Sequence, residues 1–131
     1  MNRRDFMLLT AGAVTLPQIT WAKAMTYTPG LVKEKLAAGE TVLIDYTATW
    51  CGTCRAQGRV LDNLKAANAT YEQNITFIDI DWDQFGRGDL AKELGIPRRS
   101  TLVLLRGDQE LGRIVADTRE SSIKELLDRA L

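Results

Sequence analysis

The 131-residue sequence contains no histidine and only two cysteines, and each shortage excludes a class of function. Without histidine there is no Ser-His-Asp triad and no imidazole metal ligand. With two cysteines, a structural zinc site would lack two of its four soft ligands. The 17 basic and 17 acidic side chains cancel, so no basic field indicates a nucleic-acid partner. What remains, 45% hydrophobic and 26% charged, is typical of a single globular domain.

Residues 1–24 have the pattern of an export signal. The Arg3-Arg4 pair precedes a short, moderately apolar run that is too short to span a bilayer, and an Ala-Lys-Ala cleavage pattern ends at Ala24. Because Phe6 follows the arginine pair after one residue, the segment resembles a twin-arginine signal, and a general secretory signal is the alternative. Both predict a periplasmic protein, cleaved after Ala24, with a mature domain over residues 25–131.

The mature domain alternates helix and strand patterns, which predicts an α/β fold with four strands. Helices are expected over residues 29–38, 51–69, 89–94 and 123–130, and strands over 41–46, 75–82, 101–105 and 110–115. The strand at 41–46 is apolar almost throughout, as is typical of a strand covered on both faces. The last two strands are separated by a Gly107-Asp108 turn and therefore predict an antiparallel hairpin.

Cys51 and Cys54 lie where the first strand pattern gives way to a helix pattern. The start of a helix favours an anion, so Cys51 is expected to be more acidic than a free cysteine. Cys54, one turn later, is expected to lie deeper and to attack a mixed disulfide formed on Cys51. This spacing predicts thiol–disulfide exchange. The alternative is a structural staple, but a disulfide that closes so short a loop contributes only about 2 kcal/mol.

Asp45 is the one charged residue in the apolar strand before the cysteines. Burial would disfavour its charged form and raise its pKa, so a buried carboxyl here should have a partner or a function. The alternative is an acid at the strand end that is turned toward water.

The order of elements, the Trp50-Cys51-Gly52-Thr53-Cys54 motif and Asp45 six residues before the first cysteine resemble the thioredoxin family. The resemblance implies a central mixed four-stranded sheet flanked by helices. It implies that Cys51 is the attacking thiolate, that Cys54 is the resolving thiol, and that Asp45 is the acid/base that helps deprotonate Cys54. Trp50 would pack beside the site, and Gly52 and Thr53 would tune the redox potential. No metal or bound cofactor is implied, because the electrons travel in the cysteine pair.

One departure from the family pattern concerns the residue directly before the third strand. Members usually carry a cis-proline there, and the adjacent backbone accepts a substrate chain. The ungapped alignment puts Ser100 at this place, with a trans peptide bond, and the alternative is a shifted loop in which Pro97 serves. Arg99, Ser100 and Thr101 are then expected to line the substrate site. Arg98 and Arg99 would lower the thiolate pKa and favour acidic partners, unless both are solvated loop charges.

The expected function is that of an exported thiol–disulfide oxidoreductase, and Gly-Thr between the cysteines resembles the reducing branch of the family. Disulfides persist outside the cytoplasm, so a reductase there needs electrons from a membrane thiol donor. Its partners would be protein thiols and disulfides of the cell envelope, with no nucleic acid, and a monomer is expected. Two alternatives stay open: a disulfide oxidase with a quinone-linked partner, and a binding module that acts as a chaperone or a soft-metal carrier.

Overall fold

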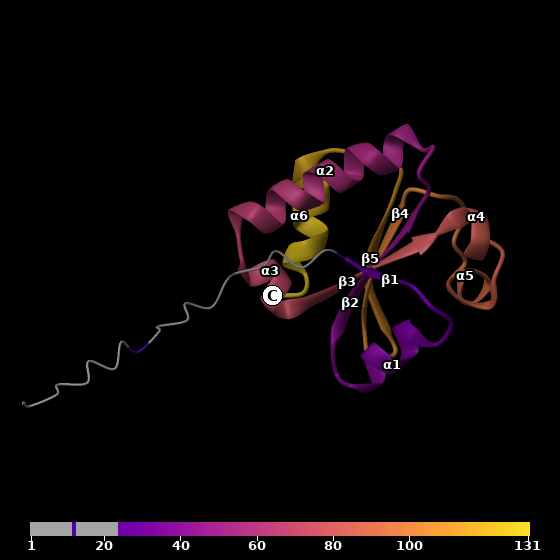
Figure 1. Cartoon of the computed structure of the whole chain (residues 1–131), viewed down its shortest axis with the longest axis horizontal. Helices are drawn as coiled ribbons and strands as arrows, with labels where there is room; N and C mark the ends of the chain where they lie inside the picture. Colours follow the sequence, from indigo (N-terminus) through magenta and orange to yellow (C-terminus); the bar gives the residue numbers. More distant parts are fainter. Residues whose placement is uncertain (1–11, 13–23) are drawn as a thin grey trace, which may run out of the picture.

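The computed structural model describes residue 12 and residues 24–131. Its strands and helices begin at Met25 and form one mixed sheet with helices on both faces (Figure 1). The predicted export signal therefore lies, apart from Gly12 and Ala24, outside the described residues. In the described part of the chain, no helix is long and apolar enough to cross a membrane.

The sheet has five strands, one more than the sequence predicted. They are β1 (Met25–Thr26), β2 (Thr41–Thr47), β3 (Ile75–Asp81), β4 (Thr101–Arg106) and β5 (Gln109–Val115), and they lie in the order β1-β3-β2-β4-β5. β2 runs parallel to β3 and antiparallel to β4, and β4 and β5 form the predicted hairpin. The extra strand, β1, pairs with β3 through only two residues, so it is too short to produce an alternating pattern.

The helices are α1 (Leu31–Ala37), α2 (Gly52–Ala67), α3 (Thr70–Asn74), α4 (Trp82–Phe85), α5 (Asp89–Leu94) and α6 (Glu120–Asp128). Neither α3 nor α4 was predicted from the sequence pattern. Trp82, which was expected in a strand, instead begins α4, because the Asp81 side chain accepts a hydrogen bond from the Asp83 N–H at 3.1 Å and caps the new helix.

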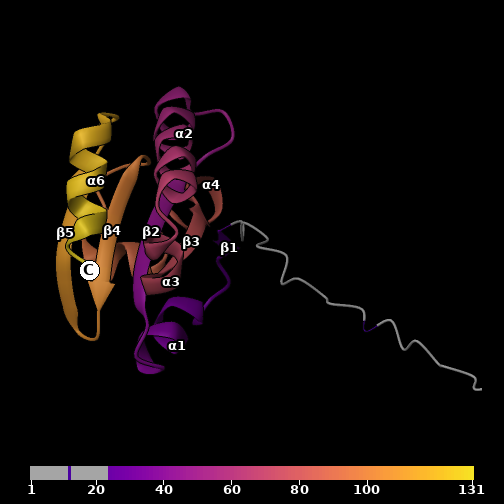
Figure 2. The same cartoon turned by 90° about the vertical axis from the view of Figure 1, so that its left-hand side faces the viewer.

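The helices divide into two layers (Figures 1 and 2). Side chains of α2, α3 and α6 form one core with Leu43 and Leu104, and side chains of α1, α4 and α5 form the other with Ile44 and Val103. Successive residues of a strand point to opposite faces, so β2 contributes to both cores, as its nearly continuous apolar run predicted. Asp45 shares its face with Leu43 and so lies on the side of α2, the helix that begins after Cys51.

The sheet also brings the cysteine pair close to the loop before β4. β2 ends just before the pair, and Tyr46 of β2 is the register partner of Thr101, the first residue of β4. Because β2 and β4 are antiparallel neighbours, the last residues of β2 lie beside the first residues of β4, at one end of the strands.

Candidate active site around the cysteine pair

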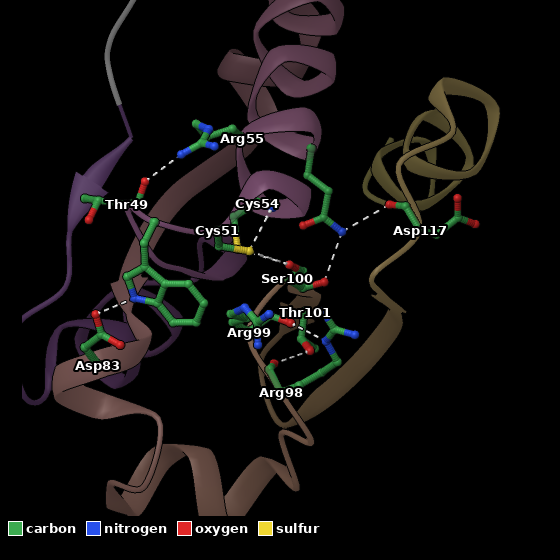
Figure 3. The surroundings of a disulfide bond; sticks show 12 residues. Thr49, Cys51, Cys54, Arg55, Asp83, Arg98, Arg99, Ser100, Thr101 and Asp117 are labelled. Carbon is green, nitrogen blue, oxygen red and sulfur yellow. Dashed lines mark hydrogen bonds between the residues drawn. A yellow bond between two sulfur atoms is a disulfide. The ribbon is translucent and has the colours of Figure 1, made fainter.

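Cys51 is the N-cap of the 16-residue helix α2 and has extended backbone angles. Its Sγ accepts a hydrogen bond from the Cys54 N–H at 3.2 Å, and a disulfide joins the two residues (Figure 3). The sulfur of Cys51 therefore lies where free N–H groups and the positive end of the helix dipole favour a negative charge. This is the placement that the sequence predicted.

The exposure of the pair differs from the expectation that Cys54 lies deeper. Each cysteine is only 2% exposed. Trp50, by contrast, is 54% exposed, and Gly52 is also at the surface. A partner that reaches Cys51 must therefore contact the motif residues on either side of it.

Ser100 faces the disulfide, and its hydroxyl lies within hydrogen-bond distance of both sulfurs (Figure 3). The Ser100 Oγ lies 3.3 Å from the Cys51 Sγ and 3.0 Å from the Cys54 Sγ. The peptide bond before Ser100 is trans, as expected. The φ angle of Ser100, 64°, is in the left-handed region. Pro97 lies at the surface. Of the two alternatives for this place in the loop, the geometry selects Ser100.

Gln57 supports this loop and was missed by the sequence analysis. It is fully buried on α2, and its Nε2 donates to the carbonyl oxygens of Ser100 at 3.0 Å and Asp117 at 3.1 Å. A signal was present, because Gln57 precedes Leu61 by four residues and Leu64 by seven and so falls on the apolar face of the helix. A buried amide on that face needs hydrogen-bond partners in the fold.

Arg99 and Trp50 form a stacked pair beside the site. The guanidinium carbon of Arg99 lies 4.5 Å from the centroid of the Trp50 ring, within cation–π range. The indole Nε1 donates to Asp83 Oδ2 at 2.8 Å, which holds the ring through its edge. Arg99 is thus placed next to the cysteine motif through the tryptophan.

The neighbours of Arg99 in the loop are held mainly by the loop itself. Arg98 Nε donates to the Arg99 carbonyl at 3.1 Å, and the Thr101 hydroxyl donates to the Arg98 carbonyl at 2.7 Å. Thr101 is fully buried, so its hydroxyl stabilises the loop from inside. Of the two arginines that were expected to border the sulfurs, Arg99 contacts Trp50 of the cysteine motif, and Arg98 contacts the backbone of its own loop.

Asp45 is a buried carboxyl, so the alternative of an acid turned toward water is wrong. It is 6% exposed, and its Oδ1 has no hydrogen-bond partner. Burial, with a smaller contribution from the charge of Asp79, raises its pKa from 3.8 to about 8, while the charge of Lys65 opposes the rise. Asp45 is consequently protonated at neutral pH.

Asp45 and Cys54 line the same groove, which has a volume of about 950 Å³ and runs along α2 and β3. Lys65 and Asp79 also line it. Lys65 follows Leu61 by four residues and so falls on the same face of α2. It is only 7% exposed, and its ammonium lies 4.1 Å from the centroid of the Phe77 ring. The Asp45 carboxyl and Cys54 therefore border one and the same groove.

These groups can carry out disulfide exchange in which the two sulfurs carry the electrons. One sulfur is at a helix start, its partner is one turn away, and a protonated acid shares a groove with that partner. Within residues 24–131, no three histidine, cysteine, aspartate or glutamate side chains are grouped so as to hold a metal ion.

Known proteins of similar sequence and structure have one family description in common. Residues 24–129 match the family model described as Thioredoxin. The mitochondrial thioredoxin-2 of Schizosaccharomyces pombe is 35% identical over 67% of this chain and 62% of its own length, so the chain spans less than two thirds of that relative. Thioredoxin 1 of Nostoc is 27% identical over 76% of this chain and 88% of its own length. The crystal structure of Trxlp from Edwardsiella tarda has a TM-score of 0.69 and 27% identity, covering 80% of this chain and 98% of that one.

Proposed function

Because the chain belongs to the thioredoxin family, we propose that it reduces protein disulfides with the Cys51-Gly52-Thr53-Cys54 pair. The observation that carries the proposal is the position of the Cys51–Cys54 disulfide at the start of α2, where Cys51 caps the helix. A helix start stabilises the thiolate, which is the reactive form of cysteine.

The first step of the reaction is the attack of the Cys51 thiolate on one sulfur of a substrate disulfide. A Cys51–substrate bond forms, the substrate disulfide breaks, and the departing sulfur leaves with the electron pair and then takes up a proton. In the second step the Cys54 thiolate attacks the Cys51 Sγ and releases the second substrate sulfur. Two electrons have then passed to the substrate, and the enzyme is left with its Cys51–Cys54 disulfide.

Asp45 supports the second step as the acid/base of Cys54. Its pKa of about 8 is close to that of an ordinary thiol, roughly 8.5, so a proton can pass between the two groups in either direction at little free-energy cost. Both groups line the same groove, which leaves room for the transfer to run through water.

Trp50 and Arg99 form the surface that a substrate protein meets first. The ring is the most exposed large apolar side chain near the sulfurs, and the guanidinium stacked on it adds a positive charge. This combination favours acidic protein segments. Replacing Arg99 with Ala should raise KM for an acidic protein substrate and the thiolate pKa. An unchanged KM and pKa would show that Arg99 is only a loop charge.

The protein is proposed to act in the periplasm after cleavage behind Ala24. The arginine pair and the Ala-Lys-Ala pattern support export, and β1 begins at Met25, so the described sheet is retained after cleavage. Its substrates are then envelope proteins, and its electrons come from a membrane thiol donor. Cell fractionation with N-terminal mass spectrometry tests this: a periplasmic form that begins at Met25 is expected, and a cytoplasmic form that retains residues 1–24 would contradict it.

Insulin reduction in the presence of dithiothreitol tests the activity itself. The native protein should accelerate the reaction, Cys51→Ser should abolish the acceleration, and Cys54→Ser should stop turnover after the first step. A native protein that does not accelerate the reaction, or a Cys51→Ser variant that still does, would overturn the proposal. A redox potential as high as the roughly −120 mV of a strong periplasmic oxidant would argue for the opposite direction of electron flow.

A further inference from the structure

The Ser100 hydroxyl occupies a position that the mechanism above does not use. Its Oγ lies within 3.3 Å of both sulfurs, and these sulfurs are the only side-chain partners of that oxygen in the described part of the chain. Ser100 is fully buried, so solvent does not compete for the hydroxyl proton.

The backbone holds this hydroxyl in place. The Ser100 N–H donates to the Tyr46 carbonyl at 2.7 Å, and the Ser100 carbonyl accepts from the Ala116 N–H at 2.9 Å and from Gln57 Nε2 at 3.0 Å. These three bonds keep the residue at φ 64°, a conformation that is unfavourable for serine. Adjacent strands and the cysteine helix thus fix the direction in which the side chain points.

We propose that the Ser100 hydroxyl is a catalytic hydrogen-bond donor to the sulfur that carries the negative charge during disulfide exchange. A hydroxyl has one proton, so it serves one sulfur at a time, and it lies between the two that exchange charge. A thiolate accepts a hydrogen bond far more strongly than a disulfide sulfur does. The contact is therefore weak in the disulfide and becomes strong when the bond opens. This inference rests on the proposed disulfide exchange.

The step in which the oxidised enzyme is reduced shows the role most clearly. A donor thiolate attacks the Cys51 Sγ, a donor–Cys51 bond forms and the Cys51–Cys54 bond breaks. Cys54 leaves with the electron pair, and Ser100, 3.0 Å away, donates its hydrogen bond to the new thiolate. The proton that finally neutralises Cys54 comes from Asp45, which lines the same groove and is protonated at neutral pH. The hydroxyl keeps its own proton throughout.

The proposal has a measurable consequence for the redox equilibrium. A donor that stabilises the thiolate but not the disulfide favours the reduced form. Removing it should shift the equilibrium with glutathione about tenfold toward the disulfide, which for two electrons lowers the potential by about 30 mV. The pKa of the cysteine thiol that forms the thiolate should rise by about one unit, because its anion has lost the hydrogen bond from Ser100.

Two variants separate the hydroxyl from the backbone. Ser100→Ala removes the hydroxyl and keeps a side chain at positive φ, whereas Ser100→Gly removes the hydroxyl and also relieves the strain. The proposal predicts that both lower the potential and raise the thiolate pKa by similar amounts, although their stabilities differ. If the alanine variant does not fold, the glycine variant alone decides the question. Thr76→Val is the matched control. Thr76 lies on β3, away from the sulfurs, and its hydroxyl donates to Glu40.

The proposal is overturned if the glycine variant keeps the native potential and thiolate pKa, or if Thr76→Val shifts them as much. Shifts in the alanine and glycine variants that follow their stabilities would also overturn it, because a backbone role would explain them. Native protein that fails to reduce insulin would instead remove the proposed function. Active native protein with unchanged Ser100 variants would remove only this inference.

Discussion

Replacing Asp45 with Asn should stabilise the oxidised protein, and the gain should grow as the pH rises. In the folded protein the pKa of Asp45 is raised to about 8 from its ordinary 3.8, chiefly because the carboxyl is buried. Between these two values the folded state keeps a proton that the unfolded state has lost. The unfolding free energy of the native protein must therefore fall with increasing pH in this range, by up to about 1.4 kcal/mol per pH unit.

The magnitude follows from the width of that range. Between pH 4 and pH 8 the accumulated penalty is on the order of 5 kcal/mol, and it is constant at higher pH, where Asp45 is ionised in both states. Asn has nearly the same shape but no proton to lose. We therefore expect native protein and variant to differ little near pH 4, and the variant to be more stable by several kcal/mol near pH 9.

Urea titrations followed by tryptophan fluorescence at several pH values between 4 and 9 would measure this difference. The oxidised form is the right sample, because its disulfide-bonded cysteines do not titrate. Asp108→Asn, in the hairpin turn, controls for the loss of one exposed acid. Parallel stability curves for the native protein and Asp45→Asn would refute the reasoning, because they would mean that Asp45 ionises as easily in the fold as outside it.

Three further substitutions test the surroundings of the site. Lys65→Met removes the charge that holds the pKa of Asp45 down, so a carboxyl ¹³C NMR titration should show that pKa moving upward, and a downward shift would contradict the assignment. Ser100→Pro forces φ to about −65° where the fold has 64° and deletes the N–H that bonds to Tyr46, so urea unfolding should show a loss of about 3 kcal/mol or more; native stability would contradict the left-handed geometry. Gln57→Leu removes the side-chain donor to the Asp117 carbonyl and one of the two donors to the Ser100 carbonyl, so the same assay should show a loss of about 1–3 kcal/mol, and an unchanged midpoint would contradict those bonds.

The elements that the sequence predicted are those with a pattern several residues long. The apolar run of β2 and the β4–β5 hairpin were predicted close to their observed bounds. The two-residue β1 has no such pattern. The end of β3 is set by the Asp81 cap, a local hydrogen bond that competes with continued alternation through Trp82.

The chemistry of the site was predictable where it depends on sequence spacing. Cys51 and Cys54 are one helical turn apart in any helix, and Asp45 is conspicuous as an acid in an apolar strand. The contact of Ser100 with both sulfurs depends instead on the pairing of β2 with β4, which sequence spacing does not contain. Lys65 shows a different difficulty, because lysine is usually exposed, while this one is buried with its ammonium over the Phe77 ring.

The measurement that tests the central claim most directly is the capture of a mixed disulfide. Reduced Cys54→Ser protein, mixed with insulin and analysed by mass spectrometry without added thiol, should carry an insulin chain bound covalently through Cys51. Cys51→Ser protein treated in the same way should carry almost none, because its remaining sulfur lacks the position at the helix start. Equal adducts on both variants, or none on either, would contradict the account.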